Sequence, residues 1–287
     1  MIQRAVILGA GTMGAGIAEV CARAGIETEL CDVNIDAAKK GLAGIEKSLA
    51  RAVEKQKLTA DEAQAIRGRI SAVSSFEGAT RADLIVEAVP EDIGLKKKIL
   101  GDLSTKNAGA ILATNTSSLS VTEIAAACQG PDRVIGMHFF NPPPIMPLLE
   151  LVRAEQTSQA TVDAALEYTK RIGKDPIVVN DSPGFATSRL GIILGIEAIR
   201  MLEAGVAQAA DIDRAMKLGY KHPMGPLELT DLVGLDVRLA IADHLTKEIG
   251  PQFTPPPLLR RLVRAGKLGK KTGEGFYKWI DGKAVEK

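Results

Sequence analysis

The feature that most constrains the fold is a glycine motif, G-x-G-x-x-G, at residues 9–14. It follows residues 5–8, a short apolar run that is typical of a strand covered on both faces. The pattern then predicts a helix over residues 10–24, ended by a glycine, and a second strand over residues 27–33. A strand, a glycine loop, a helix and another strand in so short a stretch predict a βαβ unit and therefore a parallel sheet.

Each glycine of the motif has a role in binding a dinucleotide. Gly9 permits the tight turn, Gly11 lets a pyrophosphate approach the backbone, and Gly14 lets the helix lie close to the strand. We expect the phosphates at the N–H groups of the helix start, near Thr12 and Met13, because the helix macrodipole favours negative charge there.

Asp32 indicates which dinucleotide is bound. It lies at the end of the second predicted strand, 21 residues after Gly11, where a carboxylate accepts hydrogen bonds from a ribose diol. The same carboxylate would repel a 2′-phosphate, so NAD is favoured over NADP. In the alternative reading, the glycines only tighten a turn and Asp32 only caps the next segment. The agreement of four positions favours the cofactor site.

Strand and helix patterns continue to alternate over about the first 180 residues. Further strands are predicted at 84–86, 110–113, 134–139, 148–152 and 176–179. Helices are predicted as a pair within 36–70, split by a capping box at Thr59 and Glu62, and at 91–103 and 120–127. The alternation predicts an α/β fold of the Rossmann type, a doubly wound and mostly parallel sheet with helices on both faces.

The character of the sequence changes at residues 181–184, Asp-Ser-Pro-Gly. Helices are predicted beyond this point at 190–204, 210–218, 226–232, 236–249 and 258–265, without a convincing strand until the tail. We therefore place the boundary near residue 183, with a dinucleotide-binding domain at 1–183 and a smaller, all-helical domain at 184–287. The first helix of the second domain is apolar on more than one face, so it could pack against a second subunit as well as against its own domain. A homodimer is the simplest explanation of this pattern.

The composition argues against several classes of partner. Lys and Arg number 36 against 35 Asp and Glu, and aromatic residues make up 3%, so neither net charge nor base stacking favours a nucleic acid. No apolar stretch reaches the length of a membrane span. Three cysteines without paired spacing fit free thiols in a reducing compartment, so we expect a cytoplasmic protein. We assign no residue to a metal.

One histidine and one glutamate are candidates for acid–base chemistry. His138 lies near the end of a predicted strand, where open α/β sheets bind their ligands, and Glu150 follows twelve residues later inside an apolar run. A turn through the proline-rich loop between them could place Glu150 beside His138, where it would orient the ring and raise its basicity. The alternatives are a core histidine with a structural partner and a glutamate that faces solvent from an edge strand.

Two other groups of residues are candidate binding residues. Asn115 and Ser117 follow a buried strand and offer amide and hydroxyl groups at the same edge, although this segment could also be a turn and helix cap. Arg51 and Lys55 are four residues apart on a predicted helix and could bind the phosphates of a substrate. On sequence alone, a solvated helix face is an equally good explanation of the second pair.

Five motifs together resemble the L-3-hydroxyacyl-CoA dehydrogenase family, most closely its short bacterial 3-hydroxybutyryl-CoA dehydrogenases. They are GAGTMG (9–14), NTSSLS (115–120), GMHFFNP (136–142), HPMGPLEL (222–229) and GKKTGEGFY (269–277). In combination these motifs are highly specific and span nearly the whole chain. The resemblance implies NAD as cofactor, an acyl-CoA as substrate, and a C-terminal helical domain that takes part in substrate binding and dimerisation.

The resemblance also implies roles for individual residues. His138 would be the catalytic base, Glu150 its partner, and Ser117 a hydroxyl that contacts the substrate near the nicotinamide. The residues implied to line the NAD site are Asn115, Glu91 and Lys96, and those implied on the substrate side are Arg51 and Lys55 against the CoA phosphates, and Asn141.

One position departs from the family pattern. Ser188 stands where many relatives carry an active-site asparagine, after the Pro-Gly-Phe turn at residues 183–185. Serine can donate a hydrogen bond but reaches less far than asparagine, so substrate preference or rate could differ from those relatives.

The implied reaction is oxidation of a (3S)-3-hydroxyacyl-CoA by NAD to the 3-oxoacyl-CoA, and its reverse, with a short acyl chain as the first expectation. A related dehydrogenase acting on a free hydroxy acid or sugar acid is a second hypothesis. A third is a non-catalytic NAD-binding protein similar to the lens crystallin that resembles this family. The presence of both His138 and Glu150 favours the enzyme.

Overall fold

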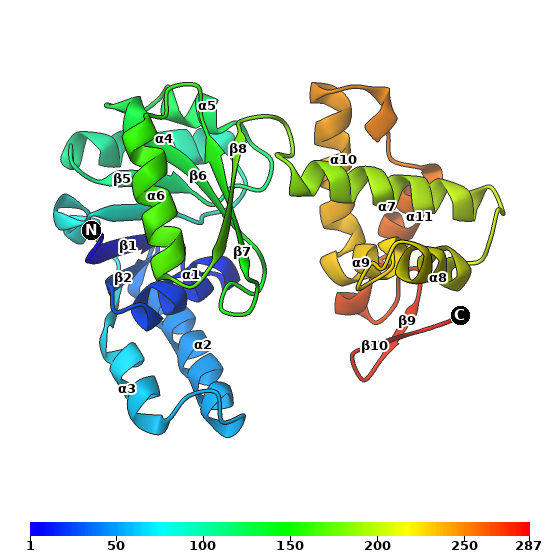
Figure 1. Ribbon diagram of the computed structural model, residues 1–287, viewed down its shortest axis with the longest axis horizontal. Helices are drawn as coiled ribbons and strands as arrows, with labels where there is room; N and C mark the ends of the chain where they lie inside the picture. The colour runs from blue at the N-terminus through cyan, green and yellow to red at the C-terminus, as the bar shows by residue number, and fades with distance from the viewer. The chain divides into compact units, whose positions relative to one another are not determined.

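The computed structural model describes residues 1–287, which form two compact units, Met1–Ser182 and Pro183–Lys287 (Figure 1). The first unit contains an eight-stranded sheet. Its strands are β1 (Arg4–Leu8), β2 (Glu27–Cys31), β3 (Ile70–Val73), β4 (Leu84–Glu87), β5 (Ile111–Thr114), β6 (Val134–Phe139), β7 (Leu148–Arg153) and β8 (Asp175–Asn180).

The strand order is β3-β2-β1-β4-β5-β6-β7-β8. The first six strands of this order pair in parallel, β7 runs antiparallel to β6, and β8 is parallel to β7. The chain order reverses between β1 and β4, which is where doubly wound sheets open a crevice for a ligand at their carboxyl edge. The predicted Rossmann-type α/β fold is confirmed.

Helices cover both faces of this sheet. They are α1 (Thr12–Arg23), α2 (Ile35–Glu54), α3 (Ala60–Gly68), α4 (Ile93–Lys106), α5 (Val121–Ala125) and α6 (Gln159–Arg171), with 3₁₀ turns η1 (Glu77–Arg81) and η2 (Pro131–Arg133). Met137 of β6 belongs to the core that also contains Ile17 of α1 and Tyr168 of α6. Its neighbour His138 therefore points to the opposite face, because side chains alternate along a strand. Figure 1 shows α6 lying across the sheet and the α2–α3 pair projecting from it.

Two elements of this unit are missing from the sequence prediction. Strand β3 has one buried residue, Ile70, at the edge of the sheet, so its sequence shows no apolar run. Helix α6 buries Thr161 and Thr169 together with Val162, Ala165 and Tyr168. The two threonines interrupt the apolar periodicity by which a helix is recognised.

The second unit is largely helical. Its elements are α7 (Thr187–Glu203), α8 (Ala209–Gly219), α9 (Pro226–Val233), α10 (Leu235–Glu248), η3 (Pro251–Phe253), α11 (Pro257–Arg264), η4 (Lys270–Thr272), and the antiparallel tail strands β9 (Lys278–Ile280) and β10 (Lys283–Val285). The expected helices are present to within a few residues at each end. No helix of the chain is long and apolar enough to cross a membrane.

Two buried aspartates hold this second unit together. Asp213 accepts hydrogen bonds from the N–H groups of Leu227 and Glu228, both at 2.8 Å, and from the Tyr277 hydroxyl at 2.8 Å. Asp231 accepts the backbone N–H of Tyr277 at 2.9 Å and the Trp279 indole N–H at 3.0 Å. Burial raises the pKa of both carboxyls, and the hydrogen bonds oppose that rise.

The same aspartates account for the glycines of the two C-terminal motifs. A Cβ on Gly225 would lie 2.2 Å from the Cβ of Asp213, and a Cβ on Gly275 would lie 2.1 Å from Asp231 Oδ1. A side chain at either position would displace the carboxylate from its donors. The HPMGPLEL and GKKTGEGFY motifs therefore have a structural basis within this unit.

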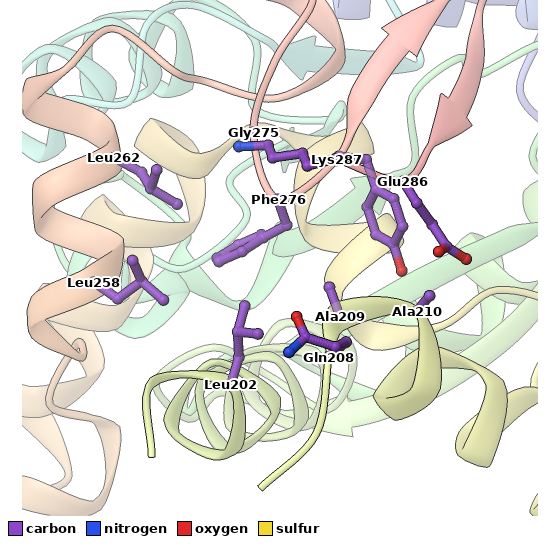
Figure 2. A pocket seen from close by; sticks show the side chains of 11 residues that line it. Leu202, Gln208, Ala209, Ala210, Leu258, Leu262, Gly275, Phe276, Glu286 and Lys287 are labelled. Carbon is purple, nitrogen blue, oxygen red and sulfur yellow. The ribbon is translucent and has the colours of Figure 1, made fainter. Parts of the chain in front are cut away.

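A cavity of about 290 Å³ lies in the second unit, between the end of α7, the start of α8, α11 and the tail (Figure 2). Leu202, Leu258, Leu262 and Phe276 give it an apolar lining, and Glu286 and Lys287 stand at its side. None of the residues predicted for the functional site lines it.

Candidate active site

The glycine motif forms an open cradle between β1 and α1. Gly9 has a φ of +93°, and a Cβ there would lie 2.7 Å from the carbonyl oxygen of Ala88. A Cβ on Gly14 would lie 1.7 Å from the Gly9 oxygen, so the helix could not approach the loop. A Cβ on Gly11, in contrast, would meet no protein atom within 4 Å. The space beside Gly11 is therefore open to a ligand, as a pyrophosphate requires.

The start of α1 has no acceptor of its own. Gly11 is the N-cap residue, no side chain caps the helix, and its first turn contains no acidic residue. Such a helix start leaves N–H groups for an anion. Asp32 Oδ2 accepts the N–H of Ala10 at 2.6 Å and its Oδ1 accepts that of Val33 at 2.7 Å, which ties the loop to the end of β2. These residues fit a dinucleotide.

A buried ion pair stands behind the ends of β4 and β5. Lys96 Nζ lies 2.8 Å from Glu87 Oε1 and 3.2 Å from Glu91 Oε2, and Lys96 and Glu87 are both fully buried. Glu87 also accepts the N–H of Val89 and the hydroxyl of Thr114, each at 2.7 Å. Removing either member of such a buried ion pair would leave the other as an uncompensated buried charge, which strongly destabilises the folded protein. We therefore expect Lys96 and Glu87 to keep these positions.

Glu91 extends this arrangement to Ser117. Its Oε1 accepts the Ser117 N–H at 2.9 Å and the Ser117 hydroxyl at 3.3 Å, and it also accepts the hydroxyl of Thr116. Lys96 has 1% of its side chain exposed and Glu91 has 37%, so Glu91 is the member of this pair that reaches solvent. Glu91 and Lys96 are two of the three residues implied to line the NAD site, and Lys96 lies buried behind Glu91.

Asn115 joins the ends of two neighbouring strands. Its side-chain oxygen accepts the N–H of Phe139 at 2.9 Å, and its own N–H donates to the carbonyl of Glu87 at 2.8 Å. Asn115 thereby fixes the end of β6, which carries His138, relative to β5.

His138 and Glu150 face each other across the β6–β7 pair. The two residues are directly opposite in register, and His138 Nδ1 lies 2.9 Å from Glu150 Oε2. Glu150 is fully buried and His138 is 7% exposed. The ring of Phe140 lies 4.5 Å from the imidazole, centroid to centroid. A carboxylate held against Nδ1 favours the tautomer that carries its proton on Nδ1 and leaves Nε2 as the free acceptor.

Three of the remaining predicted residues are exposed in the first unit. Arg51, in the last turn of α2, and Lys55, its C-cap, are exposed and form no ion pair. Asn141 is exposed at the start of the loop between β6 and β7. Ser188 lies in the first turn of α7, in the second unit.

Two residues of the site, and one buried residue outside it, Lys174, were not predicted from the sequence. Glu87 could have been identified from the sequence, because it is a carboxylate at the end of an apolar strand. Glu150 was selected because it also lies in an apolar run. Thr116 lies between two residues of the predicted set, but its contact with Glu91 depends on the fold. Lys174 follows the glycine turn after α6 and has no pattern that marks it as buried.

Comparisons with known proteins point to one family. Residues 4–182 match the model of the 3-hydroxyacyl-CoA dehydrogenase NAD-binding domain, and residues 184–279 match the model of the C-terminal domain of the same family.

Individual relatives are similar over nearly their full length. A 3-hydroxybutyryl-CoA dehydrogenase of Clostridioides difficile is 44% identical over 96% of this chain and 99% of its own. The mitochondrial hydroxyacyl-coenzyme A dehydrogenase of Rattus norvegicus is 43% identical over 97% of this chain and 92% of its own. The crystal structure of an (S)-3-hydroxybutyryl-CoA dehydrogenase from Ralstonia eutropha superposes with a TM-score of 0.93 at 42% identity, covering 98% of this chain and all of that one (100%).

Proposed function

The chain belongs to the 3-hydroxyacyl-CoA dehydrogenase family, and we propose that it is the short-chain member of this NAD-dependent enzyme class, with His138 and Glu150 as its acid–base pair. The proposed substrate is (3S)-3-hydroxybutyryl-CoA and the product is its 3-oxoacyl-CoA, with the reverse reaction at the same site. The names of the relatives support a four-carbon acyl group.

The observation that carries the proposal is the buried contact between His138 Nδ1 and Glu150 Oε2, 2.9 Å apart. When bound, NAD supplies the hydride acceptor for C3 of the substrate. His138 removes the proton of the 3-hydroxyl group as that hydride leaves, and Glu150 stabilises the imidazolium that results. In the reverse direction, protonated His138 donates its proton to the developing alkoxide.

Other residues bind and orient the reactants in this proposal. The NAD site is formed or supported by the glycine motif and by the residues around it: Gly9, Gly11, Thr12, Met13, Gly14, Asp32, Glu91, Lys96 and Asn115. Ser117, which Glu91 holds by two hydrogen bonds, contacts the substrate near the nicotinamide. Arg51 and Lys55 bind the CoA phosphates as exposed cations with no carboxylate to compete for them. Asn141 and Ser188 contribute polar contacts to the substrate.

We assign NAD binding to residues 1–183 and substrate binding and dimerisation to residues 184–287. One observation on the second unit supports a homodimer. Leu190 and Leu194 of α7 are 62% and 45% exposed, which leaves apolar surface on this helix for a second copy to cover. Three buried free cysteines, Cys21, Cys31 and Cys128, support a reducing, cytoplasmic location.

The test is NADH consumption with acetoacetyl-CoA, repeated with NADPH, with longer 3-oxoacyl-CoA substrates and with free acetoacetate. We expect turnover with acetoacetyl-CoA and NADH, slower turnover with longer chains, and little with NADPH or the free acid. Equal activity on free acetoacetate would indicate a dehydrogenase of free acids. NADH binding without oxidation by any of these substrates would indicate a non-catalytic protein.

A further inference from the structure

The loop that joins β6 to β7 can form few backbone hydrogen bonds of its own. Residues 140–147 connect the strands that carry His138 and Glu150, and four of these eight residues are proline. Proline has no N–H, so half of the loop cannot donate a backbone hydrogen bond. Within the loop, Ile145 and Met146 both donate to the carbonyl of Pro142, at 3.0 and 3.1 Å. The shape of the rest of the loop depends on groups outside it.

Lys174 is the first of these groups. Its Nζ donates to the carbonyl of Pro143 at 2.6 Å and to that of Met146 at 2.7 Å. Lys174 is buried, forms no ion pair, and has a pKa lowered by burial and by the nearby charge of Arg23. A buried ammonium without a carboxylate is costly. The mechanism described above gives it no role, so its two contacts with the loop require another explanation.

Gly16 of α1 is the second group. A Cβ at this position would lie 2.7 Å from Cδ and 2.8 Å from Cγ of Pro143, so the proline ring rests directly on the helix backbone. Pro143 is therefore held on one side by Lys174 and on the other by α1. The N-terminus of α1 is the cradle that fits the dinucleotide, whereas the two ends of the loop lead to His138 and Glu150.

We propose that Lys174 is a positioning residue for the acid–base pair, and that it fixes the loop together with the Gly16–Pro143 contact. The loop then keeps His138 and Glu150 in register with each other and at a constant place relative to α1. This inference rests on the proposed role of His138. A displacement of the loop would lengthen the contact between Nδ1 and Oε2, and small misplacements of reacting groups cost large factors in rate.

Lys174→Met tests the first contact, with Lys170→Met as the matched control, because Lys170 is exposed on α6 and forms no ion pair. We expect kcat for acetoacetyl-CoA reduction to fall about 10- to 100-fold in Lys174→Met while the Kd for NADH stays within about 2-fold. The KM for acetoacetyl-CoA should also stay within about 2-fold, because the variant misplaces the reacting groups and leaves the binding contacts intact. Lys170→Met should match the wild type in all three measurements.

Gly16→Ala tests the contact between Gly16 and Pro143. It replaces Lys174→Met as the test if the circular dichroism spectrum shows that Lys174→Met is not folded. Its control is Gly44→Ala on α2, where a Cβ would meet nothing within 4 Å. The same fall in kcat, with KM and the Kd for NADH unchanged, is expected in Gly16→Ala and not in Gly44→Ala. Folded variants with wild-type kcat would overturn the inference. Inactivity of the wild type on acetoacetyl-CoA would instead overturn the proposed function.

Discussion

At the scale of residues, three carboxylates of the first unit differ in the group that each one contacts, and this group determines what each carboxylate can do. Glu87 forms an ion pair with Lys96, whose Nζ lies 2.8 Å from its Oε1. Asp32 accepts two backbone N–H groups and serves the cofactor loop. Glu150 faces His138, and an imidazole is the side chain whose ordinary pKa allows it to gain and lose a proton near neutrality. Glu150 is therefore the carboxylate of the three suited to assist proton transfer.

Glu150→Gln is the corresponding prediction. Glutamine keeps the shape of the side chain but removes the charge that stabilises the imidazolium, so kcat should fall by about 100-fold or more. NADH affinity, measured by fluorescence titration, should be unchanged. Glu155→Gln is the control, since Glu155 is exposed just after β7. Unaltered turnover in Glu150→Gln would remove the glutamate from the mechanism.

At the scale of elements, the tail of the chain is held by the carboxylates of α8 and α9. Tyr277 donates its hydroxyl to Asp213, and its pKa is raised by burial and by this contact with a carboxylate. Trp279, the single tryptophan of the chain, donates to Asp231. The fluorescence of Trp279 therefore reports directly on whether the tail is in place.

Tyr277→Phe should lower the free energy of unfolding at pH 7 by about 1.5–3 kcal/mol, the usual contribution of a hydrogen bond to a charged group. Burial raises the pKa of Asp213, so protons bind more readily in the folded state and the contribution of this group to stability declines as pH rises through that pKa. The effect of the variant should shrink as the pH falls through the raised pKa of Asp213, because a protonated carboxyl accepts the Tyr277 hydroxyl less strongly than a carboxylate does. Urea unfolding followed by Trp279 fluorescence measures both effects. Tyr220→Phe, at a side chain that is 76% exposed, should cost almost nothing, and an equal cost in both variants would contradict the assignment.

Helices and strands with a regular apolar periodicity or a capping box could be predicted from the sequence. Those whose burial depends on contacts with distant parts of the chain could not. The capping box at Thr59 and Glu62 is present as expected and opens α3. Strand β3 escaped because a sheet edge needs few apolar residues, and α6 escaped because threonines stand in its buried stripe. The burial of Lys174 depends on a loop that lies 31 residues earlier in the chain, which no local pattern encodes.

At the scale of the whole molecule, the first unit contains both the dinucleotide cradle and the proposed acid–base pair, His138 and Glu150. The sequence located these two parts separately, from a glycine motif and from a histidine and a glutamate with a proline-rich loop between them. Their placement on one unit depends on the strand order, which puts β1, β4, β5 and β6 side by side with their carboxyl ends at one edge. The glycine motifs of the second unit serve its own packing around Asp213 and Asp231.

The most direct measurement is the single-turnover rate of acetoacetyl-CoA reduction by saturating NADH in His138→Gln and in the wild type. If His138 transfers the proton, the rate should fall by about 10²–10⁴-fold in the variant while NADH binds with wild-type affinity. A rate within a few-fold of the wild type, with NADH equally bound, would show that the proton comes from another group.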